Sequence, residues 1–135
     1  MQQALTITGL SKAFPGVKAL DDVGFSVAPG EVHALLGENG AGKSTLLKIL
    51  SGVYRADSGE ILVAGKPVHI TSPKSASQAG IAMIHQELQQ VPELDVAQNM
   101  FLGSAPTIAG VLVNRAEARR RANEVLAMLD PSIDV

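Results

Sequence analysis

The chain has no cysteine and no tryptophan, and it has one tyrosine and three phenylalanines among its 135 residues. Without cysteine there is no disulfide and no thiolate metal site, which suits a reducing compartment. Because 46% of the residues are hydrophobic but only 3% are aromatic, Leu, Ile, Val and Ala must fill the core. A chain of this length is expected to form one domain or part of one.

A basic charge balance and a long apolar run are also missing. The formal net charge is −2, so nucleic acid is not expected as a partner. No run reaches the roughly 18 apolar residues of a membrane-spanning helix. The stretch from Met1 to Thr8 lacks the charged start and apolar segment of a signal peptide. The sequence therefore predicts a soluble, cytoplasmic chain, and this is compatible with a membrane-embedded partner.

What the sequence does contain is a phosphate-binding loop. Residues 37–44 read Gly-Glu-Asn-Gly-Ala-Gly-Lys-Ser, which matches the pattern G-x-x-x-x-G-K-[ST]. Its glycines let the backbone curl so that several N–H groups point at phosphate oxygens, and a helix N-terminus adds further donors. Lys43 adds a cation beside the outer phosphates, and Ser44 adds a Mg²⁺ ligand.

The segments on either side of this loop support the interpretation. Residues 31–36 are mostly apolar and predict a buried strand, while residues 44–50 predict the start of a helix with an apolar face. Strand, glycine loop and helix is the order that a P-loop requires. The alternative is an accidental match, which average residue usage produces in fewer than about 1% of chains of this length.

The other strand signals surround this motif. Residues 4–36 carry alternating apolar patterns, and the segments 59–64 and 67–70 predict a hairpin around Gly65 and Lys66. A short buried strand is expected over Ile81–Ile84.

Three further helices are expected. Ser72 and Pro73 fit an N-cap and a first helical residue, and a second helix covers residues 96–102. Asn114 and Glu117 resemble a capping box that opens a helix over residues 115–129. The apolar positions expected on one face of this last helix are Ala118, Ala122, Val125, Leu126 and Leu129. The run Arg119-Arg120-Arg121 on it is interpreted as a solvated face rather than an anion site.

The loop resembles that of the ATP-binding-cassette (ABC) family rather than those of P-loop GTPases or kinases, because Asn39 and Gly40 lie inside it and Thr45 follows it. Residues 11–16 look like the family's adenine-stacking segment, with Phe14 as the aromatic residue. Residues 83–87 look like its Q-loop, with Gln86 as the glutamine. No guanine-recognition motif is present, which argues against a GTPase.

The resemblance implies a set of site residues. Mg²⁺ would be held by Ser44 and Gln86, and Gln86 would also position the attacking water as the catalytic residue. ATP would be bound by Phe14, Gly37, Glu38, Asn39, Gly40, Ala41, Gly42, Lys43, Ser44 and Thr45.

The resemblance also implies the fold, an α/β P-loop NTPase of which this chain is the N-terminal part. Residues 1–36 and 59–70 would form an antiparallel β region, and residues 37–58 the loop and its helix. Residues 81–86 would form the Q-loop strand, and residues 94–135 the start of a helical subdomain.

Within the family, the loop together with residues 84–88 and 99–103 is most similar to ATPase subunits of bacterial monosaccharide importers. These carry two cassettes in tandem, and the chain looks like the front of the first. The implied partners are transmembrane permease subunits, a second ATPase cassette and, indirectly, a periplasmic sugar-binding protein. The implied location is peripheral, on the cytoplasmic face of the inner membrane. Leu88, Val91, Leu94 and Phe101 would offer apolar contacts to a permease helix, or else pack their own loop.

The family's signature segment, Walker B carboxylates and switch histidine are not found. Leu50-Ser51-Gly52 imitates the signature but ends the P-loop helix, and Asp130 imitates Walker B but closes a helical pattern before Pro131. We therefore expect this chain alone to lack ATPase activity, and the alternative function is a nucleotide-binding module without catalysis.

Several residues have a structural alternative. Phe14 could pack in the core and Gln86 could be an ordinary loop residue. His33 and His85 are expected in the core rather than in acid–base roles, and His69 in a strand.

Overall fold

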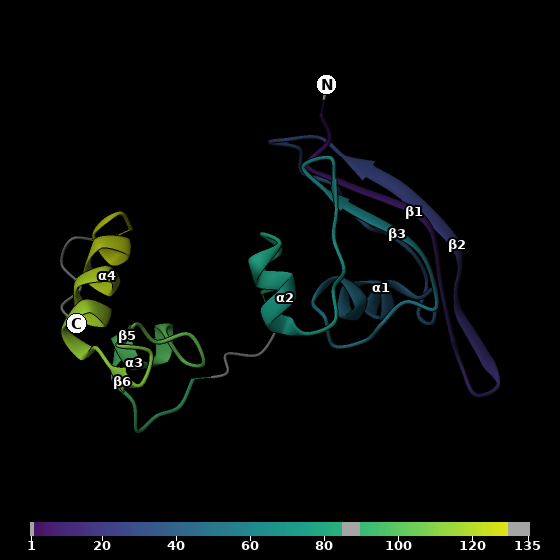
Figure 1. The fold of residues 1–135 in the computed structure, drawn as a ribbon. Coiled ribbons are helices and arrows are strands. Elements are labelled where there is room, and N and C mark those ends of the chain that lie inside the picture. The colour runs from purple at the N-terminus through teal and green to yellow at the C-terminus, as the bar shows by residue number, and fades with distance from the viewer. Residues whose placement is uncertain (1, 85–89, 130–135) are drawn as a thin grey trace. The chain divides into compact units, whose positions relative to one another are not determined.

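The computed structural model describes residues 2–84 and 90–129, which belong to two compact units, residues 1–84 and residues 85–135. Unit 1 is built on a four-stranded antiparallel sheet in the order β2-β1-β3-β4 (Figure 1). Its strands are β1 (Leu5–Phe14), β2 (Val17–Val27), β3 (Ser58–Val63) and β4 (Lys66–Pro67). The expected antiparallel β region is therefore confirmed, with β4 shorter than the sequence predicted.

Alternation of side chains sets the register of this sheet. Ile7 on β1 lies opposite Phe25 on β2 and Ile61 on β3, so apolar residues of three strands share one face. β1 and β3 approach closely at Gly59, whose φ is +99° and where a Cβ would lie 2.6 Å from the carbonyl oxygen of Gly9. Only glycine fits there without moving one of the strands.

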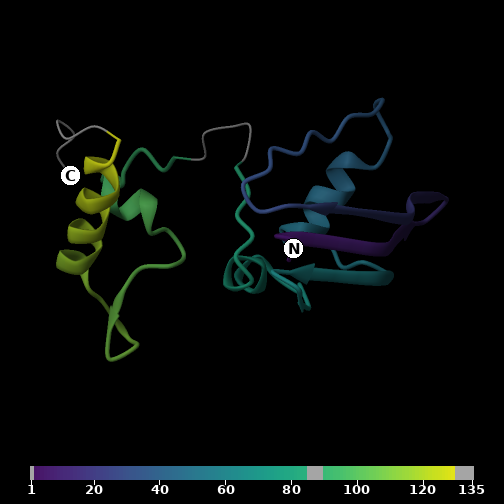
Figure 2. The ribbon, with the colours of Figure 1, turned by 90° about the horizontal axis from the view of Figure 1, so that it is seen from above.

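The P-loop helix α1 (Lys43–Leu50) covers that apolar face. The two ribbon views agree in placing it along one side of the sheet (Figure 2). Leu46 and Ile49 of α1 are each 2% exposed. The core that they join is made of Ile7, Leu10, Leu20, Leu46, Ile49, Ile61, Ile70 and Ala76. As the composition requires, aliphatic residues form this core.

Helix α2 (Pro73–Gln78) confirms the start predicted from Ser72 and Pro73. Ser72 and Ser75 form a reciprocal capping box, in which the backbone N–H of Ser75 donates to Ser72 Oγ at 3.2 Å. Buried Ala76 attaches the helix to the core.

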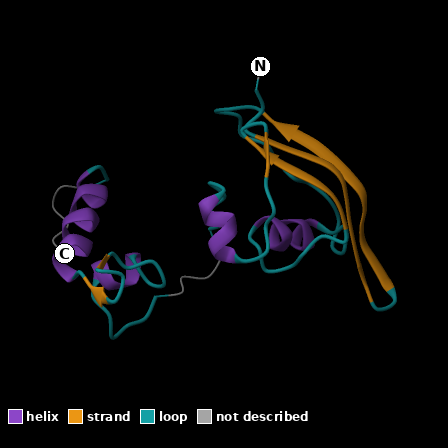
Figure 3. Cartoon of the chain, viewed as in Figure 1, coloured by secondary structure: helices purple, strands orange, loops and turns teal. Residues whose placement is uncertain are grey.

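Two expected strands are not formed. Residues 31–36 and 81–84 carry no strand assignment (Figure 3), and Val32, Leu36 and Ile84 are 97%, 89% and 97% exposed. A strand requires a neighbour for its backbone hydrogen bonds, and no described strand pairs with either segment. Their apolar sequences are of the kind that is covered on both faces in parallel sheets.

Unit 2 contains α3 (Val96–Met100), β5 (Thr107–Ile108), β6 (Leu112–Val113) and α4 (Arg115–Ala127). The buried alanines Ala97, Ala118 and Ala122 belong to the two helices. Asp95 and Gln98 form a capping box at the start of α3, which the sequence interpretation missed.

The predicted α4 is confirmed, with two corrections. Its N-cap Asn114 accepts the N–H of Glu117 at 3.1 Å, but the Glu117 carboxylate pairs with arginines instead of closing a capping box. Val125 and Leu129, expected on the apolar face, are 47% and 78% exposed. Among residues 2–84 and 90–129, no helix has both the length and the apolar character needed to cross a membrane.

Candidate functional site

The P-loop ends at a helix terminus that no side chain caps. Gly42 is the N-cap of α1, with φ +85°, and it makes no side-chain cap hydrogen bond. The backbone N–H groups of the first helical turn have no intrahelical partner. These donors lie next to Gly40, whose φ is +87°, a left-handed conformation that glycine adopts without strain. The terminus therefore offers N–H groups to an anion.

Gly42 also fixes the loop against the sheet. A Cβ at this position would meet the carbonyl oxygen of Ala19 and would lie 2.8 Å from Cδ2 of Leu20. Because Ala19 and Leu20 belong to β2, a larger residue would push the loop away from the strand. The contact places the start of α1 beside the sheet.

Lys43 folds back over its own loop. Its Nζ donates to the carbonyl oxygens of Gly37 at 2.6 Å and Glu38 at 2.8 Å. A bend in the loop is held by the Ala41 N–H, which donates to the Glu38 carbonyl at 3.2 Å. The ammonium is thus kept at the loop by neutral acceptors. Anionic oxygens bind an ammonium more strongly than carbonyls do.

A cavity of about 380 Å³ lies over the loop. Most of its lining residues belong to the P-loop and the start of α1, and its other wall comes from the β1–β2 hairpin. The lining residues are Phe14, Val17, Ala19, Asn39, Gly40, Ala41, Gly42, Lys43, Ser44 and Thr45. The fold therefore gathers Phe14, Lys43, Ser44 and most of the other expected site residues around one space, with Gly37 and Glu38 contacting Lys43 beside it. Gln86 lies outside the described residues.

Phe14 stands at the end of β1 and is half-buried. Its ring meets that of Tyr54 with centroids 5.3 Å apart and planes at 67°. Lys12 Nζ lies over the ring, 5.5 Å from its centroid. Phe14 is not among the buried core residues, which argues against the alternative of a purely structural core role. The contact with Tyr54 was missed at the sequence level because it joins residues 40 positions apart in the chain. Lys12 lies two residues before Phe14 on the same strand, so their side chains share one face of the sheet.

The histidines that the structure describes do not lie in the core. His33 and His69 are exposed, so the expected core placement of His33 is wrong, and His69 lies outside the short β4. The His33 ring stacks on Phe25 with centroids 5.4 Å apart, and its Nδ1 lies 3.1 Å from Glu31 Oε1. The backbone N–H of Ala28, and then His33, lower the pKa of Glu31. Neither histidine lines the cavity over the P-loop. His85 lies outside the described residues.

Arg119, Arg120 and Arg121 of α4 are exposed and paired with carboxylates. Arg120 reaches Glu117 at 2.7 Å and Glu124 at 2.5 Å, and Arg121 reaches Glu117 at 2.7 Å. Hydrogen bonds from Arg120 and then Arg121 lower the pKa of Glu117 to about 2. Carboxylates already occupy these guanidinium groups, which agrees with a solvated face and not with an anion site.

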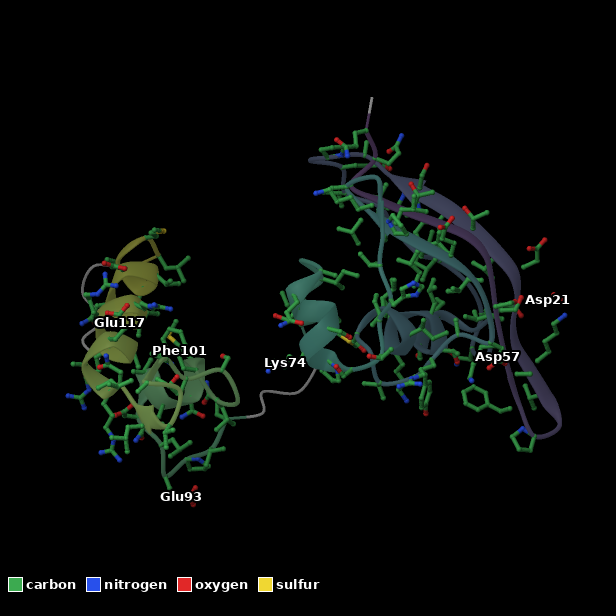
Figure 4. The ribbon with its side chains drawn as sticks, viewed as in Figure 1. Asp21, Asp57, Lys74, Glu93, Phe101 and Glu117 are labelled. Atoms are coloured by element: carbon green, nitrogen blue, oxygen red, sulfur yellow. The ribbon has the colours of Figure 1, made fainter. Side chains whose placement is uncertain are left out.

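Unit 2 has a cavity of its own, of about 670 Å³. Leu94, Phe101, Leu102, Val113 and Ala118 supply its apolar wall, with Asp95, Arg115 and Arg119 also lining it. Figure 4 labels Phe101 and Glu117 in this unit. Of the residues expected to contact a partner, Leu94 and Phe101 line this cavity. Val91 instead exchanges two hydrogen bonds with the Asn99 side chain, and Leu88 lies outside the described residues. The contribution of α4 to the cavity was not predicted.

The P-loop lies within a segment of the chain that matches a known protein family. The ABC transporter family model matches residues 20–133. The chain belongs to the ABC transporter family. The chain is 52% identical over 134 residues to an arabinose import ATP-binding protein of Burkholderia ambifaria. Over 121 residues it is 57% identical to a ribose import ATP-binding protein of Rhodopirellula baltica. These alignments cover 99% and 90% of the chain but only 26% and 24% of the two relatives, so it spans about a quarter of their length.

Solved structures confirm the fold class. An ATP-binding cassette of an ABC transporter superimposes with a TM-score of 0.77 at 28% identity, covering 98% of this chain and 56% of that one. A nucleotide-free cassette gives a TM-score of 0.67 at 29% identity over 90% of this chain and 46% of that one. The chain therefore corresponds to part of such a cassette.

Proposed function

We propose that this chain is the ATP-binding front part of an ABC transport ATPase that drives sugar import. The observation that carries the proposal is the cavity that joins Phe14 to residues 39–45. One side offers backbone N–H groups and a lysine, and the other offers an aromatic ring. A nucleotide has a phosphate end and a flat base, and it requires both kinds of contact.

On this proposal, the loop binds the phosphates through the backbone N–H groups at the start of α1. Lys43 exchanges the carbonyls of Gly37 and Glu38 for phosphate oxygens, because charge-assisted hydrogen bonds are the stronger ones. Phe14 offers its ring to adenine. Asn39, Ala41 and Thr45 line the same space and complete the ATP-binding set with the loop glycines and Glu38.

Ser44 lines the cavity one residue after Lys43, and its hydroxyl would be a ligand of Mg²⁺ bound with the nucleotide. When bound, the metal neutralises charge on the phosphate oxygens. We assign to Gln86 the second metal contact and the positioning of water.

For the whole protein, we propose hydrolysis of ATP coupled to uptake of a sugar. This is supported by the relatives named for arabinose and ribose import. The proposed partners are transmembrane permease subunits, a second ATPase cassette and, indirectly, a periplasmic sugar-binding protein, with the subunit peripheral on the cytoplasmic face of the inner membrane. In unit 2, the cavity that Leu94 and Phe101 line is the proposed docking site for a permease helix.

Residues 1–135 alone are proposed to bind nucleotide without turning it over. Phosphoryl transfer requires a group that positions water and a charge that stabilises the γ-phosphate from the opposite side, and Gln86 alone cannot supply both. The alternative, a binding module that is also inactive in the intact protein, is separated from the first proposal by measuring phosphate release from that protein.

The test of the site is calorimetry of ATP binding to the intact protein and its Lys43→Ala variant. We expect Lys43→Ala to weaken ATP binding at least tenfold, since it removes a charge-assisted contact worth about 1.5–3 kcal/mol. Lys66→Ala on exposed β4 is the control and should bind like the wild type. Equal affinity of Lys43→Ala and wild type would overturn the site.

A further inference from the structure

Hydrogen bonds of Asp57 hold the part of β1 that precedes Phe14. Its carboxylate accepts Lys12 Nζ at 2.7 Å and the backbone N–H of Ala13 at 2.7 Å. Its own N–H donates to the carbonyl of Ser11 at 2.9 Å. Three consecutive residues of β1 are thus tied to the turn before β3, immediately ahead of the ring. The hydrogen bonds from Lys12 and then Ala13 lower the pKa of Asp57, because both donors stabilise the charged carboxylate.

Lys12 and Tyr54 contact the Phe14 ring itself. The ammonium of Lys12 lies 5.5 Å from the ring centroid, and the Tyr54 ring meets Phe14 at 67° with centroids 5.3 Å apart. Tyr54 in turn lies beneath Lys48 of α1, whose Nζ is 5.3 Å from its centroid. Cation–π and edge-to-face contacts are directional. The orientation of Phe14 therefore depends on both β1 and the P-loop helix.

Lys12, Tyr54 and Asp57 do not line the cavity over the P-loop, whereas Phe14 does. An exposed ion pair alone has little effect on stability, and the pair Lys18–Asp21 is of that kind, with side chains 58% and 66% exposed. The Lys12 side chain is only 17% exposed, and its partner Asp57 also holds the backbone. Figure 4 labels Asp21 and Asp57, the acidic residues of the Lys18–Asp21 and Lys12–Asp57 pairs.

We infer that Lys12, Tyr54 and Asp57 are positioning residues that hold the Phe14 ring for stacking on the adenine of ATP, and so set the preference for the nucleotide over its triphosphate alone. The inference rests on the proposed function, in which Phe14 is the base platform. It assigns to these three residues an effect on base binding and none on phosphate binding.

The experiment compares ATP with inorganic tripolyphosphate by calorimetry on the intact protein. Asp57→Asn and Lys12→Met should each raise the dissociation constant for ATP about two- to fivefold, which is at most the effect of losing one aromatic stacking contact. Neither should change tripolyphosphate binding. Lys12→Arg keeps a cation over the ring and should retain wild-type affinity. The matched controls Lys18→Met and Asp21→Asn, from the exposed pair on the same hairpin, should bind both ligands like the wild type.

A double-mutant cycle distinguishes positioning from general destabilisation. In a Phe14→Ala background, Asp57→Asn should cause no further loss of ATP affinity. If Phe14→Ala does not weaken ATP binding relative to tripolyphosphate, the base-platform role in the proposed function fails. If Phe14→Ala does so while Asp57→Asn and Lys12→Met bind ATP like the wild type, the positioning inference alone is overturned. Equal losses for both ligands in these variants would likewise overturn it.

Discussion

Unit 1 contains two kinds of apolar segment: one kind is buried in the core and the other is largely exposed. Strands β1 and β3 place Ile7, Leu10 and Ile61 in the core, at 2%, 1% and 7% exposure. Residues 31–36 and 81–84 are at least as rich in apolar residues, yet Val32 and Ile84 are almost fully exposed. The difference lies in pairing: β1 and β3 have antiparallel partners within the described residues, and the other two segments have none.

The comparison shows that an apolar sequence indicates that a segment is to be buried, but not which neighbouring element buries it. An antiparallel neighbour can follow after a short turn, as β2 follows β1 across Pro15 and Gly16. A parallel neighbour comes only after a long crossover. Since the relatives are about four times as long as this chain, we propose that further strands of the intact protein cover residues 31–36 and 81–84.

The largest expected effect contrasts Ile7 with Leu36. In the chain of residues 1–135, Ile7→Ala should lower the free energy of unfolding by about 2–5 kcal/mol, because it leaves a cavity in the core. Leu36→Ala, at a position 89% exposed, should change it by less than about 0.5 kcal/mol. Urea unfolding measures both. Similar losses would show that residues 31–36 are buried after all, and a large loss for Leu36→Ala only in the intact protein would support cover by its further strands.

A smaller effect tests the close approach of two strands. Gly59 and Gly80 both have positive φ, +99° and +87°, but a Cβ at Gly59 would meet backbone of β1 while the space around Gly80 is open. Both changes to alanine carry the left-handed backbone penalty of about 1–2 kcal/mol. Gly59→Ala should exceed Gly80→Ala by at least about 1 kcal/mol in urea unfolding, since strands must also move apart. Equal losses would mean that β1 and β3 do not approach this closely.

The smallest effect is a pH dependence confined to unit 2. The pKa of Glu117 in the folded protein is lowered from 4.5 to about 2, so its ion pairs stabilise α4 above pH about 4.5. That contribution is lost as the pH falls from about 4.5 towards 2. Glu117→Gln should remove this part of the acid sensitivity, as followed by helical circular dichroism. If Glu117→Gln lost helical signal over the same acid range as the wild type, the ion pairs of Glu117 would not form in solution.

Local signals in the sequence were enough to predict much of the fold. Glycines and Lys43 identified the P-loop, Ser72 and Pro73 the start of α2, and Asn114 the start of α4, because turns and caps depend on neighbouring residues. What failed depended on distant partners. The strand expected over residues 31–36 had the right apolar pattern but has no neighbouring strand. His33 was placed in the core because it belongs to that expected strand.

The candidate site divides in the same way. The loop residues were predicted from a contiguous motif, and Phe14 from its resemblance to a family segment. The contact of Phe14 with Tyr54, and those of Asp57 with Lys12 and Ala13, join residues that only folding brings together. No spacing rule in the sequence indicates them.

The central claim is that the cavity between Phe14 and residues 39–45 binds MgATP. A crystal structure of the intact protein with Mg²⁺ and a non-hydrolysable ATP analogue tests it most directly. The account predicts phosphates against the start of α1 with Lys43 turned from the Gly37 and Glu38 carbonyls towards them, the metal at Ser44, and adenine stacked on Phe14. Analogue bound with its phosphates away from this loop, or with its base away from Phe14, would contradict it.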